Sequence, residues 1–168
     1  KLAAFLSVEG GELLDCSLEQ LERAWALGVR AVNLTWNYAN ALSGSNQEGA
    51  QQGLTAQGRA FVGKMAQLGM LVDVSHLSDP GFWDVAEIVE GPFMASHSCA
   101  RALCDHPRNL TDHQLRRLFE AGGYVGVNFY PLFLSGDSRA DLDRVVDHIA
   151  HMCDLGGEAH VGLGSDFD

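Results

Sequence analysis

The sequence lacks any hydrophobic run long enough to cross a membrane. A spanning helix needs about 20 consecutive apolar residues, and no apolar stretch of the 168 residues approaches that length. The opening stretch KLAAFLSVEGG also lacks the charged head, apolar core and cleavage pattern of a secretory signal peptide. We therefore expect a cytoplasmic protein with no membrane partner.

Basic residues are scarce. The 11 lysines and arginines are outnumbered by 22 aspartates and glutamates, which gives a formal net charge of -11 at pH 7. Nucleic acids and anionic membranes are polyanions that would repel such a surface. This balance predicts no nucleic-acid partner and favours a small-molecule or protein partner, with a homo-oligomer left open.

Cysteine is also sparse, and its spacing carries no metal or disulfide signature. The four cysteines are scattered and form no CxxC pair. We therefore expect reduced thiols and no zinc site made of cysteines. The sequence also has no GxSxG nucleophile elbow, P-loop or GxGxxG motif.

What the sequence does contain is a regular alternation of short apolar runs and amphipathic helical stretches. Five helical stretches separate six predicted strands, at residues 2–9, 30–35, 71–76, 92–97, 124–129 and 160–165. Strict alternation predicts a parallel sheet with right-handed crossovers. With 46% hydrophobic residues and no linker-like segment, residues 1–168 are expected to form a single domain.

Helix start signals support these boundaries. Ser17 and Thr111 are predicted N-caps, each with a glutamine three residues later as in a capping box, and Asp79 is the predicted N-cap of a third helix. A polar loop at 36–55 is unusually long for a connection of this kind, which suggests function or mobility.

In parallel-sheet enzymes the chemistry lies at the carboxyl ends of the strands. The residues at the predicted strand ends are mostly polar or ionisable: Glu9, Trp36, His76, His97, Tyr130 and Asp166. Neutral imidazoles from neighbouring strands can bind Zn²⁺ together. A single strand-end histidine is more often structural, but two at equivalent positions with nearby carboxylates favour a metal site.

Other polar residues have competing interpretations. Glu9 and Asp166 could be loop carboxylates, or a metal-bridging ligand and a metal-linked acid or base. Arg108 could be a surface charge, although its planar guanidinium suits a substrate carboxylate. His148 and His151 lie three apart on a predicted helix and are expected to form a surface pair.

Six blocks of sequence together resemble the renal (membrane) dipeptidase family of zinc peptidases. The blocks are SVEGG, VDVSHLS, ASHS, RNLTD, VNFY and VGLGSDFD, in family-like order and spacing. The resemblance implies a (β/α)8 TIM barrel with two zinc ions per site. It also implies hydrolysis of dipeptides by a metal-bridging hydroxide, with tolerance of a D-residue at the C-terminal position.

The resemblance also implies roles for individual residues. Glu9 matches the glutamate that bridges the zincs, and His76 and His97 match the histidines of the second zinc. Asp166 matches the aspartate that lies beside the first zinc and handles protons, and Arg108 matches the arginine that holds the substrate carboxylate.

The remaining predicted substrate-binding residues are Trp36 and Tyr130. Trp36 stands where the mammalian enzymes have a histidine that contacts the substrate carbonyl. This change leaves oxyanion stabilisation and substrate choice open, because an indole NH donates a hydrogen bond but cannot become cationic.

The sequence accounts for six of the eight βα units of such a barrel, interpreted as strands three to eight. The family's His-x-Asp pair, which completes the first zinc site, belongs to an early strand that these residues do not include. We therefore expect one zinc ion or none in this chain, and no turnover by the chain alone. Another metal-dependent amidohydrolase and a catalytically silent binding fragment stay open as alternatives.

Overall fold

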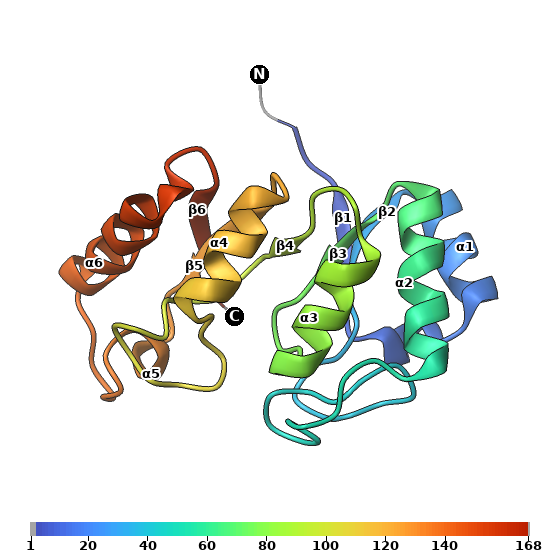
Figure 1. The fold of residues 1–168 in the computed structure, drawn as a ribbon, viewed down its shortest axis with the longest axis horizontal. Helices are drawn as coiled ribbons and strands as arrows, with labels where there is room; N and C mark the ends of the chain where they lie inside the picture. The colour runs from blue at the N-terminus through green and yellow to red at the C-terminus, as the bar shows by residue number, and fades with distance from the viewer. Residues whose placement is uncertain (1–2, 168) are drawn as a thin grey trace. The chain divides into compact units, whose positions relative to one another are not determined.

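The computed structural model describes residues 3–167, which fall into two compact units (Figure 1). Unit 1 is Lys1–Glu90 and unit 2 is Gly91–Asp168. Each unit contains three parallel strands with helices between them, as the alternation of the sequence predicts.

In unit 1 three strands pair in chain order and end level with one another. They are β1 (Leu6–Glu9), β2 (Val29–Asn33) and β3 (Leu71–Asp73). Glu9 is in register with Asn33, and Asn33 with Asp73. The helical elements are η1 (Gly11–Leu14), α1 (Leu18–Ala26), α2 (Ala56–Leu68) and α3 (Asp79–Ile88). The aligned register places polar residues of all three strands at one edge of the sheet.

The core of unit 1 forms from the apolar faces of its helices and strands. Phe61 and Met65 of α2, Phe82 of α3 and Val32 of β2 are almost completely buried. Burial of side chains of this size stabilises a fold by about 1.5–3 kcal/mol each, so this core holds the strand ends in place.

Unit 2 repeats the pattern with β4 (Met94–Ala95), β5 (Tyr124–Asn128) and β6 (Val161–Ser165). All are parallel and pair in chain order. The helical elements are α4 (Asp112–Glu120), α5 (Pro131–Leu134), α6 (Leu142–Met152) and a π-helical turn, η2 (Cys153–Gly157). A Cβ added at Gly126 would overlap the carbonyl oxygen of Ser96, so a glycine lets these strands approach closely.

Local sequence signals locate some helix ends correctly and miss others. The capping box of Thr111 and Gln114 is confirmed. Ser17 occupies the N-cap of α1, but its side chain makes no capping hydrogen bond, so the capping box predicted there is wrong. The prediction of Asp79 as an N-cap is also wrong, because Ser78 takes this position and its Oγ accepts from the Gly81 N–H at 3.1 Å.

Two further expectations concern membranes and cysteines. Within residues 3–167, no helix combines the length and the hydrophobicity that a membrane crossing requires. All four cysteines are free thiols, as their scattered spacing predicts.

Candidate metal centre and substrate residues

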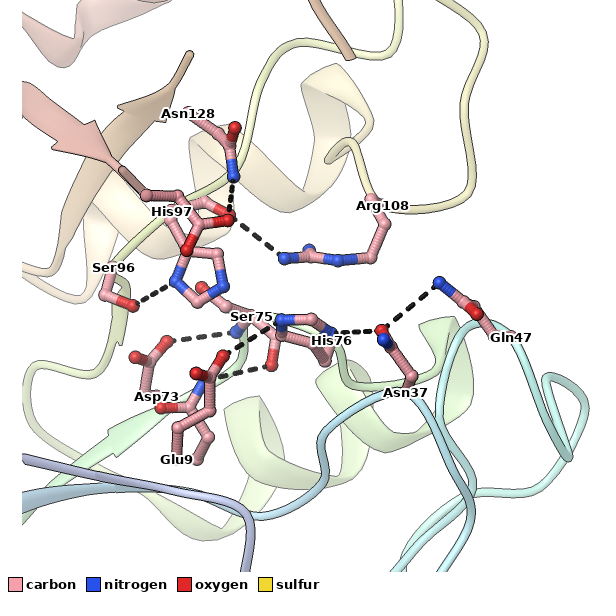
Figure 2. A network of polar contacts seen from close by, with 12 residues as sticks. Glu9, Asn37, Gln47, Asp73, Ser75, His76, Ser96, His97, Arg108 and Asn128 are labelled. Atoms are coloured by element: carbon pink, nitrogen blue, oxygen red, sulfur yellow. Dashed lines mark hydrogen bonds and ion pairs between the residues drawn. The ribbon is translucent and has the colours of Figure 1, made fainter. Parts of the chain in front are cut away.

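The carboxyl edge of unit 1 brings together two of the predicted metal ligands. Glu9 ends β1, and His76 lies in the turn that follows β3. His76 Nε2 lies 3.0 Å from Glu9 Oε1 (Figure 2). The imidazole is buried, with 6% of the residue exposed. Two ligands on one tetrahedral zinc ion, at bond lengths of about 2.0–2.1 Å, lie roughly 3.3 Å apart, so this pair is spaced to share an ion.

The other ring nitrogen of His76 is held by Asn37. His76 Nδ1 lies 3.0 Å from Asn37 Oδ1, and Gln47 Nε2 donates to the same oxygen at 3.2 Å (Figure 2). An amide oxygen only accepts hydrogen bonds, so Nδ1 carries a proton. Glu9 Oε1 also accepts, so without a metal Nε2 can donate to it, and a metal ion would take the place of that proton. A ligating histidine has this arrangement, in which the second nitrogen donates to an outer partner. The donor set therefore fits a divalent metal.

Buried polar side chains of β2 and β3 hold the turn that carries His76. Asn33 Nδ2 donates to the Ser75 carbonyl at 3.3 Å, and Asp73 Oδ1 accepts from the Ser75 N–H at 3.0 Å. His76 itself has φ +69°, a left-handed conformation that is rare outside glycine. Such backbone strain persists where the surroundings over-determine it, commonly at functional sites.

In unit 2, His97 follows β4 and is 7% exposed. Its Nδ1 lies 2.7 Å from Ser96 Oγ (Figure 2). When this hydroxyl accepts from the Nδ1 proton, Nε2 of the neutral ring is left with its lone pair. Both predicted histidine ligands therefore have their Nδ1 bonded by a neighbouring side chain of the same unit.

Arg108 is buried, with 2% of the residue exposed, so the alternative of a surface charge is wrong. Its Nη2 donates to the His97 carbonyl at 3.4 Å, and its Cζ lies 5.3 Å from the centre of the Phe133 ring. The donors of a guanidinium point outward in its plane, so a ring against its face does not block them. The Arg108 N–H donates to His106 Nδ1 at 3.1 Å, and burial first, then the charges of Arg108 and Arg101, lower the pKa of His106.

Asp166 is exposed after the end of β6, and Asn128 holds its carboxylate. Asn128 is completely buried, and its Nδ2 donates to Asp166 Oδ2 at 2.9 Å. Asn128 Oδ1 in turn accepts from the Tyr130 N–H at 2.6 Å. Ser165 and Asp166 both have positive φ, 43° and 69°. The backbone after β6 and the hydrogen bond from Asn128 therefore fix the position of the Asp166 carboxylate.

The two predicted aromatic substrate residues are exposed. Trp36 is 44% exposed and packs edge-on against Tyr38, with ring centres 5.9 Å apart. Tyr130 is 50% exposed and packs edge-on against Phe133 at 4.9 Å. Both rings are positioned by a neighbouring aromatic ring and still offer apolar surface to a ligand.

The prediction that His148 and His151 form a surface pair is wrong. His148 is fully buried: its Nδ1 accepts from the Ala100 N–H and its Nε2 donates to the Leu134 carbonyl, both at 3.0 Å. Burial lowers the pKa of His148. His151 is half-buried beside Asp112, with 2.8 Å between Nε2 and Oδ1. The acidic residues near these histidines indicate an exposed helix face, but the side chain of His148 is buried.

Sequence reasoning also missed the supporting residues Asn33, Asn37, Asp73 and Asn128. A usable signal existed for three of them, because Asn33, Asp73 and Asn128 are polar residues at the carboxyl ends of mostly apolar strands. Asn37 lies in the long polar loop, where no local pattern distinguishes it from its neighbours.

A family model and several known proteins match this chain. The family described as membrane dipeptidase (peptidase family M19) matches residues 1–168. An uncharacterized dipeptidase of Schizosaccharomyces pombe is 42% identical over 174 residues, which are 100% of this chain and 42% of that protein.

Solved structures match as well. The crystal structure of a metallopeptidase from Rhodobacter sphaeroides, liganded with a phosphinate mimic of the dipeptide L-Ala-D-Ala, is 37% identical with a TM-score of 0.89, over 98% of this chain and 50% of that one. An amidohydrolase from Pseudomonas aeruginosa is 27% identical with a TM-score of 0.88, over 96% of this chain and 49% of that one.

These matches settle the fold class. The chain spans 42–50% of the length of these three proteins. The predicted partial (β/α)8 barrel with six parallel strands is confirmed.

Proposed function

The chain belongs to the membrane dipeptidase family, peptidase family M19, and from this membership we propose that the protein hydrolyses dipeptides with a divalent metal held partly by Glu9 and His76. The observation that carries the proposal is the pair itself: a carboxylate oxygen 3.0 Å from an imidazole nitrogen whose other ring nitrogen is engaged by Asn37.

We propose that His97 supplies the third ligand and that the metal is zinc, two ions in the intact site. Imidazole and carboxylate ligands suit Zn²⁺, and a carboxylate with two oxygens can serve two cations. When bound, such a metal polarises a carbonyl and lowers the pKa of a bound water. We also propose that residues 1–168 belong to one partial metallopeptidase domain.

Arg108 is the proposed anchor for the substrate carboxylate. A planar guanidinium can bind a carboxylate through two parallel hydrogen bonds, and burial strengthens such a pair because the local dielectric is low. Phe133 and the His97 carbonyl fix the orientation of the guanidinium. The Rhodobacter structure carries a mimic of L-Ala-D-Ala, which supports a dipeptide with a D-residue at its C-terminal position. Trp36 and Tyr130 are proposed to contact the substrate side chains.

Asp166 is the proposed proton carrier. Its carboxylate is exposed and held at Oδ2 by Asn128, which leaves Oδ1 to take a proton from the attacking water and pass it to the leaving amine. General acid–base catalysis of this kind contributes about 10²–10⁴-fold to a rate. Asn128 fixes where that oxygen lies.

A substrate panel tests the proposal. The protein that carries this sequence is loaded with Zn²⁺ and offered L-Ala-D-Ala, L-Ala-L-Ala and a hydantoin. We expect hydrolysis of the dipeptides, and loss of about 10²-fold or more in Asp166→Asn. The exposed Asp137→Asn serves as a matched control with no effect.

The second candidate is another metal-dependent amidohydrolase, which the likeness to the Pseudomonas amidohydrolase favours. Turnover of the hydantoin without turnover of either dipeptide would favour this candidate and contradict the dipeptidase proposal. No turnover of any substrate by the metal-loaded protein would instead favour a silent binding role.

A further inference from the structure

We propose that Asn37 is a positioning residue, whose side-chain oxygen selects the tautomer of His76 that can bind a metal. This inference rests on the proposed function, because it assigns His76 Nε2 to the metal. It goes further in giving a task to the long loop at 36–55, whose length sequence reasoning could not explain.

The hydrogen bonds around Asn37 fix the orientation of its amide. Asn37 Oδ1 is approached by His76 Nδ1 at 3.0 Å and by Gln47 Nε2 at 3.2 Å. Gln47 presents its amide nitrogen, which can only donate, to the acceptor oxygen of Asn37. That oxygen therefore keeps a proton on Nδ1, while Nε2 faces Glu9 Oε1 at 3.0 Å and is the nitrogen that can exchange its proton for a metal.

The rest of the loop holds both partners in place. The Asn46 N–H donates to the His76 carbonyl at 2.9 Å, so the loop binds the backbone of His76 as well as its ring. Ser45 Oγ donates to the Asn37 carbonyl at 2.8 Å, and Ser45 also forms an isolated antiparallel bridge with Leu77.

These contacts explain how His76 keeps its unusual backbone conformation. A non-glycine residue at φ +69° is strained, and the backbone bond from Asn46 together with the ring bond to Asn37 holds it there. The same two bonds direct Nε2 toward Glu9 (Figure 2). The loop at 36–55 therefore holds both the backbone and the ring of His76 in place.

Replacing the Asn37 acceptor should release the tautomer without removing a ligand. In Asn37→Leu, Nδ1 loses its acceptor while Glu9 Oε1 stays beside Nε2, so the neutral ring holds its proton on Nε2 and has no lone pair there for a metal. In Asn37→Asp, a carboxylate oxygen still accepts from Nδ1. Loss of such an outer partner typically costs 10–100-fold in metal affinity, so Asn37→Leu should lose that amount and Asn37→Asp should bind as tightly as wild type or tighter.

The experiment has two readouts on the full chain. Long-range ¹H–¹⁵N correlation spectra of the metal-free protein report the tautomer of each histidine, and titration with Co²⁺ alone reports affinity through its absorption bands. Asn40→Ala is the matched control: Asn40 lies in the same loop, and its Oδ1 accepts from the Leu42 N–H at 2.8 Å without bonding His76. This control should lose stability but keep the tautomer and the affinity.

The outcomes separate the inference from the proposed function. A protonated Nδ1 in wild type that is lost in Asn37→Leu and kept in Asn37→Asp supports the inference, even if no Co²⁺ binds and the metal proposal fails. A His76 Nδ1 that keeps its proton in folded Asn37→Leu, or that lacks a proton in wild type, overturns it. If Asn37→Leu does not fold, an Nδ1 without a proton in Asn37→Asp overturns the inference and an Nδ1 proton there supports it.

Discussion

His148 offers a sharp test of how unit 2 is held together, because one buried ring bonds two separate backbone groups. Its Nδ1 accepts from the Ala100 N–H and its Nε2 donates to the Leu134 carbonyl. We consider His148→Phe, which keeps an aromatic ring and removes both hydrogen bonds, and His148→Gln, which keeps one donor and one acceptor.

The expected magnitude follows from these bonds. A buried polar group that loses its partner costs about 1–3 kcal/mol, and His148→Phe leaves two such groups. The free energy of unfolding should therefore fall by about 2–6 kcal/mol. Val146→Ala, at an exposed position of the same helix, should change it by less than about 0.5 kcal/mol.

The pH dependence gives a second signature. Burial lowers the pKa of His148 below its ordinary value of 6.5. As the pH falls through 6.5, this histidine therefore becomes protonated in the unfolded chain while it stays neutral in the folded protein. Stability from this residue is complete above the ordinary pKa and is lost below it. His148→Gln should remove this loss.

Urea unfolding at pH 7.5 and at pH 5.5 measures both effects. Wild type should lose more stability than His148→Gln between the two pH values. A loss below about 0.5 kcal/mol in His148→Phe, or an equal pH dependence in wild type and His148→Gln, would refute the structural role assigned to this ring.

Three further predictions concern a helix cap, a strand contact and thiol reactivity. Thr111→Ala should lower the free energy of unfolding by about 0.5–2 kcal/mol in urea unfolding, because the N-cap of α4 is lost; no change would contradict the cap. Gly126→Ala should lower the melting temperature, because the new Cβ would overlap the Ser96 carbonyl; calorimetry showing an unchanged transition would contradict that close approach. Burial raises the pKa of Cys99 to about 12, so iodoacetamide at pH 8 should label the partly exposed Cys153 before Cys99. Mass spectrometry of the digested protein measures the two rates. Equal labelling rates of Cys99 and Cys153 in the folded protein would contradict the burial of Cys99.

Short-range signals in the sequence predict local structure best. Both predicted N-caps of this spacing, Ser17 and Thr111, occupy the N-cap position, although only Thr111 forms the capping box with its glutamine. The N-cap of α3 was misplaced by one residue, because Ser78 and Asp79 are both good capping residues and only the backbone geometry decides between them.

Strand ends at 71–76 and 92–97 show a second limit. The apolar pattern predicts extended chain as far as His76 and His97, but β3 ends at Asp73 and β4 at Ala95. Each histidine instead lies in a turn shaped by side-chain hydrogen bonds. Contacts such as Asn37 with His76 link residues 39 positions apart, and no local pattern encodes them.

Zinc binding tests the central claim most directly. Metal-free wild type, His76→Gln, His97→Gln and the exposed-site control His113→Gln would each compete for Zn²⁺ with a chromophoric chelator. The account predicts tight binding by wild type and by the control, and at least about tenfold weaker binding, or about 1.4 kcal/mol, in each of the other two. Binding as tight in His76→Gln and His97→Gln as in wild type would contradict it.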